Sequence, residues 1–164
     1  MSGIESRAPN MVGAALLDEQ SWCGIILDGH QVDPNTAKFA YKAKASRKII
    51  LVTDSMSTIA SEQTHRHFDG HNIQLLGDKL LSDSGQLAGS ALNMMAVVNN
   101  AKDYFVIPLI EALNMASLYP AEFLGIAKTR GQLSIGADAD FTLVSTTNSS
   151  PHILNTWIGG NSIL

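Results

Sequence analysis

The sequence of 164 residues lacks the features that define several classes of protein. Cys23 is its only cysteine, so an intrachain disulfide framework is excluded. No apolar run approaches the roughly 18 residues that a membrane-spanning helix requires. Hydrophobic residues nevertheless make up 45% of the chain and charged residues 16%, a composition that excludes a wholly disordered protein. We therefore expect a folded globular chain with a sizeable core.

Positive charge is also scarce, because the formal net charge is -4 and the isoelectric point is about 5.6. This balance argues against a surface that binds nucleic acid or an anionic membrane. The first residues contain no apolar stretch after their first charge, which argues against a secretory signal, so we expect a cytoplasmic protein. The length excludes a complete (β/α)8 barrel, which needs about 250 residues.

Two short apolar runs predict strands that are buried on both faces. They are residues 22–27 (WCGIIL) and residues 48–53 (KIILVT). Residues 34–44, between them, begin with a proline and repeat alanine and tyrosine at helical spacing. A strand, helix and strand in this order predict parallel pairing through a right-handed crossover, and therefore an α/β fold.

The remaining segments are less regular. The pattern predicts a loop over residues 7–13, a polar loop over 55–70, a hairpin over 71–76 and 79–81, helices over 90–102 and 108–118, and short strands over 132–133, 141–145 and 153–158. Within the polar loop, His65 and His67 are spaced like two metal ligands. Their neighbours are polar and no apolar strand supports them, so a solvated loop is the favoured interpretation.

Polar side chains follow both apolar runs, where ligands bind in α/β sheets and barrels. Residues 28–31 (DGHQ) follow the first run, and Asp54 follows the second. A carboxylate in this place can act as a metal ligand or a general base, but it can equally cap the next helix or turn. Residues 83–90 (DSGQLAGS) form either a loop whose backbone N–H groups approach a ligand or a plain loop that leads to a helix capped by Ser90.

Five stretches of the chain carry a resemblance to a known family. They are residues 24–34, 51–54, 85–90, 111–121, and 131–141 with 157–160. In this order they resemble the C-terminal part of the N-acetylglucosamine-6-phosphate and N-acetylgalactosamine-6-phosphate deacetylases of the amidohydrolase superfamily. The resemblance implies hydrolysis of the acetamide of the sugar phosphate to the amino sugar 6-phosphate and acetate, and the sequence does not discriminate the gluco from the galacto substrate.

The resemblance also implies the architecture. Residues 1–130 would hold the last two strands and following helices of a metal-dependent (β/α)8 barrel. Residues 131–164 would hold the closing strands of a small β-sandwich. The resemblance further implies a divalent metal ion, zinc or iron, bound in the barrel of the parent family.

Individual residues match the functional positions of the family. Asp54 matches the catalytic aspartate, which deprotonates the metal-bound water and then protonates the leaving amine. Arg7 matches an arginine that contacts the sugar phosphate, a dianion that suits a guanidinium. Leu87, Ala88 and Gly89 match the loop that contacts the substrate.

The sequence departs from the family pattern at Gln31, where the family carries a substrate-binding histidine. His30 lies one place earlier, and adjacent side chains on extended backbone point in opposite directions, so His30 need not replace it. We therefore count both residues among the substrate-binding candidates. A glutamine donates hydrogen bonds, but it carries no positive charge.

A second departure concerns the metal. Met1 matches the methionine of the His-Leu-x-Asn-Ala-Met motif, whose histidine ligates the metal in the family, and the other family ligands lie further upstream. The resemblance therefore implies a truncated member with no tightly bound metal and little activity alone. The alternative is a non-catalytic remnant that exposes the apolar faces of its strands and forms homo-oligomers. A nucleotide-binding domain is disfavoured, because no phosphate-cradling glycine pattern follows residue 27.

Overall fold

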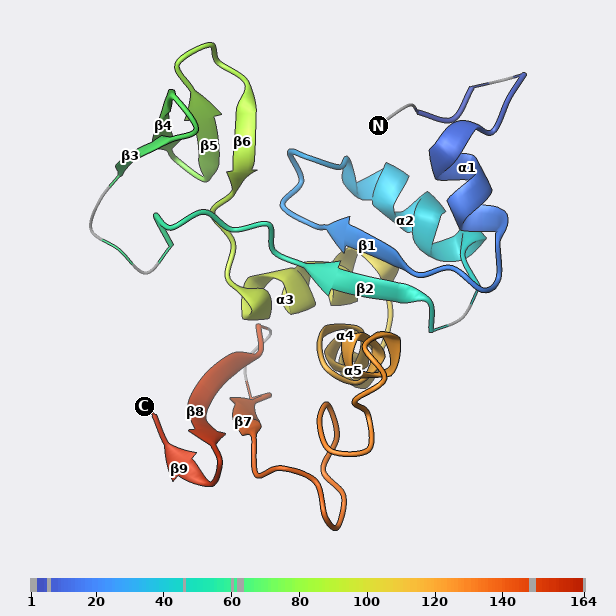
Figure 1. The fold of residues 1–164 in the computed structure, drawn as a ribbon, viewed down its shortest axis with the longest axis vertical. Helices are drawn as coiled ribbons and strands as arrows, with labels where there is room; N and C mark the ends of the chain where they lie inside the picture. Colours follow the sequence, from blue (N-terminus) through green and yellow to red (C-terminus); the bar gives the residue numbers. More distant parts are fainter. Residues whose placement is uncertain are drawn as a thin grey trace.

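The computed structural model describes residues 3–5, 7–45, 47–59, 61, 64–147 and 150–163, so Met1 lies outside the described residues. Figure 1 shows the arrangement of the elements. The helices are α1 (Asn10–Leu17), α2 (Pro34–Ala43), α3 (Met94–Phe105), α4 (Leu109–Ala116) and α5 (Leu118–Phe123). The strands are β1 (Cys23–Ile26), β2 (Ile49–Val52), β3 (His65–Phe68), β4 (His71–Leu76), β5 (Lys79–Ser82), β6 (Leu87–Ser90), β7 (Phe141–Ser145), β8 (His152–Ile158) and β9 (Asn161–Ser162).

The predicted strand–helix–strand unit is confirmed. β1 and β2 pair in parallel, with Cys23 opposite Ile49 and Ile26 opposite Val52, and α2 connects them. Asp33 caps α2, because its side chain accepts hydrogen bonds from Asn35 N and Thr36 N, and Pro34 supplies a preset φ at the first position of the helix. This unit sets the carboxyl ends of both strands side by side.

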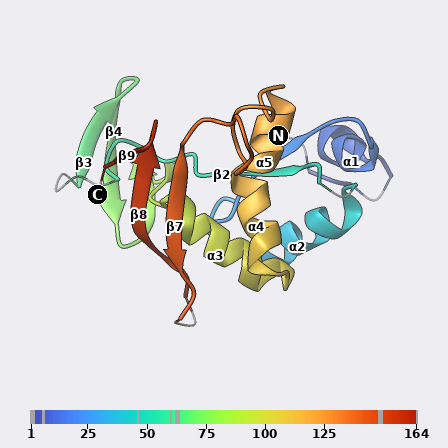
Figure 2. The same ribbon diagram turned by 90° about the horizontal axis from the view of Figure 1, so that it is seen from below.

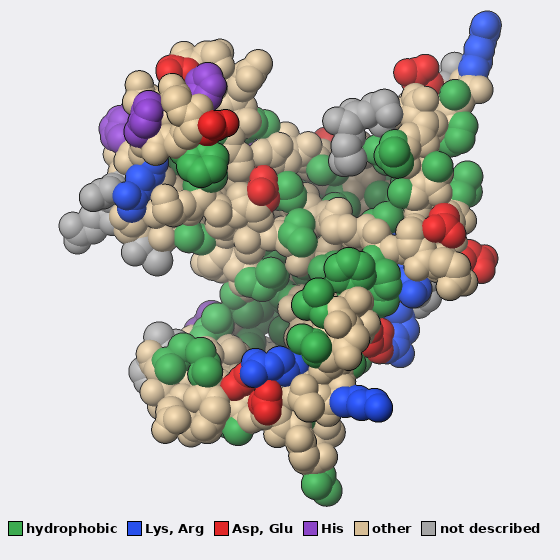
Figure 3. Space-filling view, in the orientation of Figure 1, with side chains coloured by type: hydrophobic (Ala, Val, Ile, Leu, Met, Phe, Trp, Pro, Cys, Tyr) green, Lys and Arg blue, Asp and Glu red, His purple; other side chains and the backbone are tan. Residues whose placement is uncertain are grey.

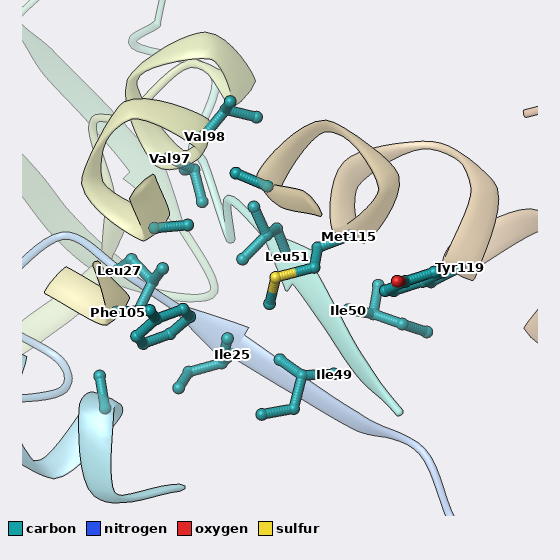
Figure 4. Packing of buried hydrophobic residues seen from close by; sticks show 13 residues of the cluster. Ile25, Leu27, Ile49, Ile50, Leu51, Val97, Val98, Phe105, Met115 and Tyr119 are labelled. Carbon is teal, nitrogen blue, oxygen red and sulfur yellow. The ribbon is translucent and has the colours of Figure 1, made fainter. Parts of the chain in front are cut away.

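The main core lies between the β1–β2 pair and the helices, as Figure 4 shows. Leu51 and Met115 point toward each other in this view, and both are almost completely buried. Leu27 and Val97 are buried completely. Burying a side chain of this size stabilises the folded state by roughly 1.5 to 3 kcal/mol, so this cluster holds β2 against α3 and α4.

A four-stranded antiparallel sheet, in the order β3-β4-β5-β6, follows β2. The predicted hairpin is confirmed as β4 and β5, but the predicted loops are wrong at two places. Residues 65–68 form β3, and the second half of the predicted glycine loop forms β6. α3 is capped by Asn93, whose side chain accepts from Ala96 N, and not by Ser90. Pairing with neighbouring strands stabilises β3 and β6 although neither has an apolar pattern of its own.

The start of the chain differs from the sequence-based expectation as well. Helix α1 begins at Asn10, inside the predicted loop. Gly13 suggests a turn, but it lies within the helix, and a Cβ at this position would come within 2.7 Å of Pro9 Cβ. Glycine is therefore required there by a close approach rather than by a turn.

The C-terminal sheet contains β7, β8 and β9 and lies beside α3 in Figures 1 and 2. Asn99 of α3 donates to the carbonyl oxygen of Pro151, which joins the helix to this sheet. Residues 132–133 do not form the predicted strand. Among the described residues, no helix is long and apolar enough to cross a membrane.

Candidate active site

Asp54 lies two residues beyond the carboxyl end of β2 and has a left-handed backbone, with φ of 51°. Its side chain is exposed and makes no hydrogen bond or ion pair with a residue that the structure describes. The capping alternative is therefore not supported, and the nearby backbone N–H of Ser55 faces the Thr53 hydroxyl instead. The Asp54 carboxylate is available to a ligand.

Strand β6 lies directly against this position. Ser90 N donates to Asp54 O at 2.8 Å, and Met56 N donates to Ser90 O at 3.2 Å. Gly89 has a φ of 82°, and a Cβ there would lie 2.9 Å from both Asp54 O and Met56 Cγ. Only glycine fits this close contact, so residues 87–90 and Asp54 form one unit.

The turn after β1 reaches the same place. Asp28 Oδ1 accepts from His30 N at 2.9 Å and from Gln31 N at 2.8 Å, which fixes the turn. Asn100 of α3 donates to Leu27 O at 2.6 Å and holds the end of the strand. Gln31 Nε2 then donates to Gly89 O at 3.3 Å. The structure therefore brings Gln31 and Gly89 together, 58 residues apart in the chain.

His30 faces a different neighbour from Gln31. Its Nε2 lies 2.9 Å from Asp78 Oδ2, in the turn between β4 and β5, although this nitrogen has no hydrogen-bond partner of good geometry. The His30 imidazole is the main cause that holds the pKa of the Asp78 carboxyl below its ordinary value. His30 and Gln31, although adjacent in the chain, thus contact different parts of the β3–β6 sheet.

The structure places Arg7 apart from the predicted site residues of β6. It is exposed in a turn closed by a hydrogen bond from Glu5 N to Ala8 O, and it makes no hydrogen bond or ion pair with the described residues. Figure 1 shows this segment beside α1 and away from β6. Its guanidinium is free for a ligand, and its assignment to the phosphate stays a prediction.

Two of the cavities that the described residues line border the sheets. The smaller, of about 210 Å³, is lined by Leu87 and Ala88 of the predicted substrate segment and by Phe68 and His71. The larger, of about 250 Å³, lies at the opposite end of β2 from Asp54, around Ile49. Two of its buried polar groups are hydrogen-bonded within the protein, because Lys44 Nζ donates to Ala15 O and the Tyr119 hydroxyl donates to Glu111, so we interpret it as structural.

Tyr119 illustrates this structural role. Its hydroxyl donates to the Glu111 carboxylate at 2.8 Å, and its side chain is buried. Burial, and then the hydrogen bond to Glu111, raise the pKa of Tyr119 to about 12. The stabilisation by Tyr119 is thus complete below pH 10 and is lost as the pH rises toward 12.

We expect Tyr119→Phe to make the chain less stable at pH 8. The variant should also lack the fall in stability that Tyr119 causes between pH 10 and pH 12. The difference in the free energy of unfolding between the two proteins should shrink by about 2 kcal/mol as the pH rises from 9 to 12. Urea unfolding across this range measures it. A difference that is constant with pH would show that Tyr119 is not the titrating group.

The metal expected from the resemblance does not fit the described residues alone. Among residues 3–163 that the structure describes, no group of three or more His, Cys, Asp or Glu side chains could hold a metal ion. His65 and His67 are exposed, as Figure 3 shows for the histidines of this sheet, but they lie on strand β3 and not in the solvated loop that the sequence predicts.

Sequence reasoning misses two residues of the site. Ser90 enters the sequence-based interpretation as the last residue of the glycine-containing loop and as a helix cap, not as a site residue, but it is buried and bonded to the Asp54 segment. Asn100 holds the end of β1 from α3. An asparagine within a helix, such as Asn100, gives no sequence signal of such a contact. Ser90, in contrast, directly follows Gly89 and could have been assigned to the substrate segment.

Comparison with known proteins gives the family. The profile of the amidohydrolase family matches residues 9–163. An N-acetylgalactosamine-6-phosphate deacetylase of Shewanella sp. (strain ANA-3) is 38% identical over 98% of this chain, which spans 40% of that relative. A provisionally named N-acetylgalactosamine-6-phosphate deacetylase of Escherichia coli K12 is 35% identical, and this chain spans 93% of it.

A solved structure agrees. The crystal structure of N-acetylglucosamine-6-phosphate deacetylase from Pasteurella multocida matches 96% of this chain with a TM-score of 0.87 and 31% identity, over 40% of its own length. The fold of this chain is therefore the fold of part of a longer amidohydrolase. The chain belongs to the amidohydrolase family, among the N-acetylglucosamine- and N-acetylgalactosamine-6-phosphate deacetylases.

Proposed function

We propose that this chain supplies the part of an N-acetylhexosamine-6-phosphate deacetylase that carries the catalytic aspartate. The observation that supports it is the meeting of Asp54, Gln31 and Gly89 at the carboxyl ends of β1 and β2, where this fold class binds ligands. The relatives are named for amino-sugar phosphates, so we propose the same substrate class here.

In this proposal Asp54 moves the proton of the hydrolysis. Its carboxylate accepts a proton from the attacking water, and the carboxylic acid then donates that proton to the amide nitrogen as the C–N bond breaks. Acetate and the amine of the sugar are the products. The exposed, unpaired Asp54 side chain supports this role, because no described protein group competes for its oxygens.

Gln31 and residues 87–89 would position the acetamide. One N–H of the Gln31 amide is used by Gly89 O, and the other can donate to the acyl oxygen on which negative charge develops. We also propose that β1 and β2 are the last barrel strands, within residues 1–130, and that β7–β9 are closing strands of a sandwich, within 131–164. Ligands for the metal would come from residues outside the described set, so we propose little or no activity for this chain alone.

A non-catalytic, oligomerising protein is the second candidate, and exposed apolar surface favours it. β1 and β2 each have one partner strand among the described residues. Val52 is 36% exposed, and Leu143, Leu154 and Ile158 on the C-terminal sheet are each more than half exposed. Figure 3 shows apolar side chains reaching the surface over several elements. Such surface is typical of an interface.

Two proteins studied side by side separate these two functions. One is this chain alone, and the other, which we define as the complemented enzyme, is this chain fused to the part of the Shewanella relative that it does not match. Acetate release from N-acetylgalactosamine 6-phosphate or N-acetylglucosamine 6-phosphate by the complemented enzyme supports the deacetylase. Stable homo-oligomers of this chain by analytical ultracentrifugation, together with an inactive complemented enzyme, would support the second candidate.

Arg7→Ala in the complemented enzyme should lower kcat/KM for the phosphorylated substrate much more than for the unphosphorylated sugar. A hydrogen bond to a charged group contributes about 1.5 to 3 kcal/mol, so kcat/KM for the 6-phosphate should fall about 10- to 150-fold. The measurement is the ratio of kcat/KM for the two substrates. If both fall by the same factor, Arg7 supports the fold and does not contact the phosphate.

A further inference from the structure

The Ser90 hydroxyl occupies an unusual place for a strand residue. Its side chain is 2% exposed, and its Oγ donates to Thr53 O and accepts from Leu92 N at 3.2 Å. A buried hydroxyl is costly unless it is hydrogen-bonded, and this one is bonded on both sides. Its oxygen therefore has a defined position beside the residue that precedes Asp54.

The backbone of Ser90 contacts the same segment. Ser90 N donates to Asp54 O, and Ser90 O accepts from Met56 N. Ser90 thus makes hydrogen bonds to Thr53, Asp54 and Met56, and its side chain supplies the first of these. No other described residue has hydrogen bonds to all three.

These bonds matter because the Asp54 backbone is strained. A left-handed φ is unfavourable for a non-glycine residue and persists only where the surroundings hold it. Thr53 O belongs to the peptide group that joins Thr53 to Asp54. Holding this oxygen fixes the orientation of that peptide group, and with it the direction in which the Asp54 side chain leaves the backbone.

We propose that Ser90 is a positioning residue for Asp54. It acts through the Thr53–Asp54 peptide group and does not touch the reacting atoms. The proposal rests on the proposed function for its catalytic consequence, but its structural content concerns this chain alone. Its hydroxyl should therefore affect the order of residues 53–56 far more than the main core.

The first test uses this chain alone, with amide hydrogen exchange followed by NMR. Ser90→Ala should speed exchange of the Met56 and Ser90 amides about 10-fold or more, the effect of losing one buried hydrogen bond, and leave Leu51 and Val97 protected. Ser90→Thr, which keeps the hydroxyl, should exchange more slowly than Ser90→Ala. Ser82→Ala is the matched control, because the Ser82 hydroxyl bonds only within its own hairpin segment. Unchanged exchange in Ser90→Ala, or equal exchange in the alanine and threonine variants, would overturn the proposal.

The second test measures catalysis in the complemented enzyme. Ser90→Ala should lower kcat about 10-fold or more with KM changed less than about twofold, since a misdirected base affects the chemical step. Ser90→Thr should regain most of kcat, and Ser82→Ala should keep it. An unchanged kcat in Ser90→Ala would overturn the catalytic consequence. If the unsubstituted complemented enzyme is inactive, the proposed function fails, and the exchange experiment alone decides whether Ser90 positions Asp54.

Discussion

Asp54→Asn is expected to lower kcat of the complemented enzyme by about 10²- to 10⁴-fold, the usual contribution of a general acid–base group. Asparagine has nearly the same shape as aspartate but cannot accept the proton of the attacking water. The Asp54 side chain has no hydrogen bond to a described residue, so the substitution removes no structural contact there. Acetate release from an N-acetylhexosamine 6-phosphate measures the effect.

The control for this variant is Asp33→Asn. Asp33 caps α2, and asparagine is an equally good cap, so the same chemical change should leave folding and activity within about twofold. Substantial activity in Asp54→Asn would show that another group moves the proton. A loss of equal size in Asp33→Asn would show that the effect is a general one of charge or stability.

Gln31→His in the complemented enzyme is expected to raise kcat/KM by up to about 10²-fold. A donor aimed at a developing oxyanion is worth about 2.7 to 4 kcal/mol, and an imidazole donates more strongly than the neutral amide, in part because it can carry positive charge. Gln31 already points to Gly89 O in β6, so the new side chain starts from a place beside the substrate segment.

His30→Gln is the matched control for this second variant. His30 is a sequence-based candidate for substrate binding, but in the structure it contacts Asp78 rather than β6, so we expect its loss to change kcat/KM less than about twofold. Steady-state kinetics of the three proteins with the same 6-phosphate substrate would decide. Equal activity with glutamine or histidine at position 31 would mean that this position does not polarise the acyl group.

The parts of the fold with local signals were predictable from the sequence. The parallel β1–β2 pair follows from two continuous apolar runs, and the start of α2 follows from Asp33 and Pro34. β3 and β6 have no such signal. Their backbone hydrogen bonds are made to neighbouring strands, and a polar segment gains a strand conformation from its partner rather than from its own pattern.

Part of the candidate site was predictable from the sequence, but its contacts and the roles of Ser90 and Asn100 were not. Asp54 and Gln31 each follow a buried strand, which is a local signal. The structure places both beyond the carboxyl ends of β1 and β2. The hydrogen bond from Gln31 to Gly89 joins residues 58 positions apart, and no local pattern encodes it. Ser90 and Asn93 are both good helix caps, so composition alone could not decide between them.

The metal content of the purified proteins tests the central claim, that this chain provides Asp54 but only part of a deacetylase site. Elemental analysis would be done on the chain alone and on the complemented enzyme, both without affinity tags. One carboxylate without histidines holds a divalent ion poorly, so we expect less than about 0.1 zinc or iron per molecule in the chain alone and about one in the complemented enzyme. About one zinc or iron ion per molecule in the chain alone would contradict the account.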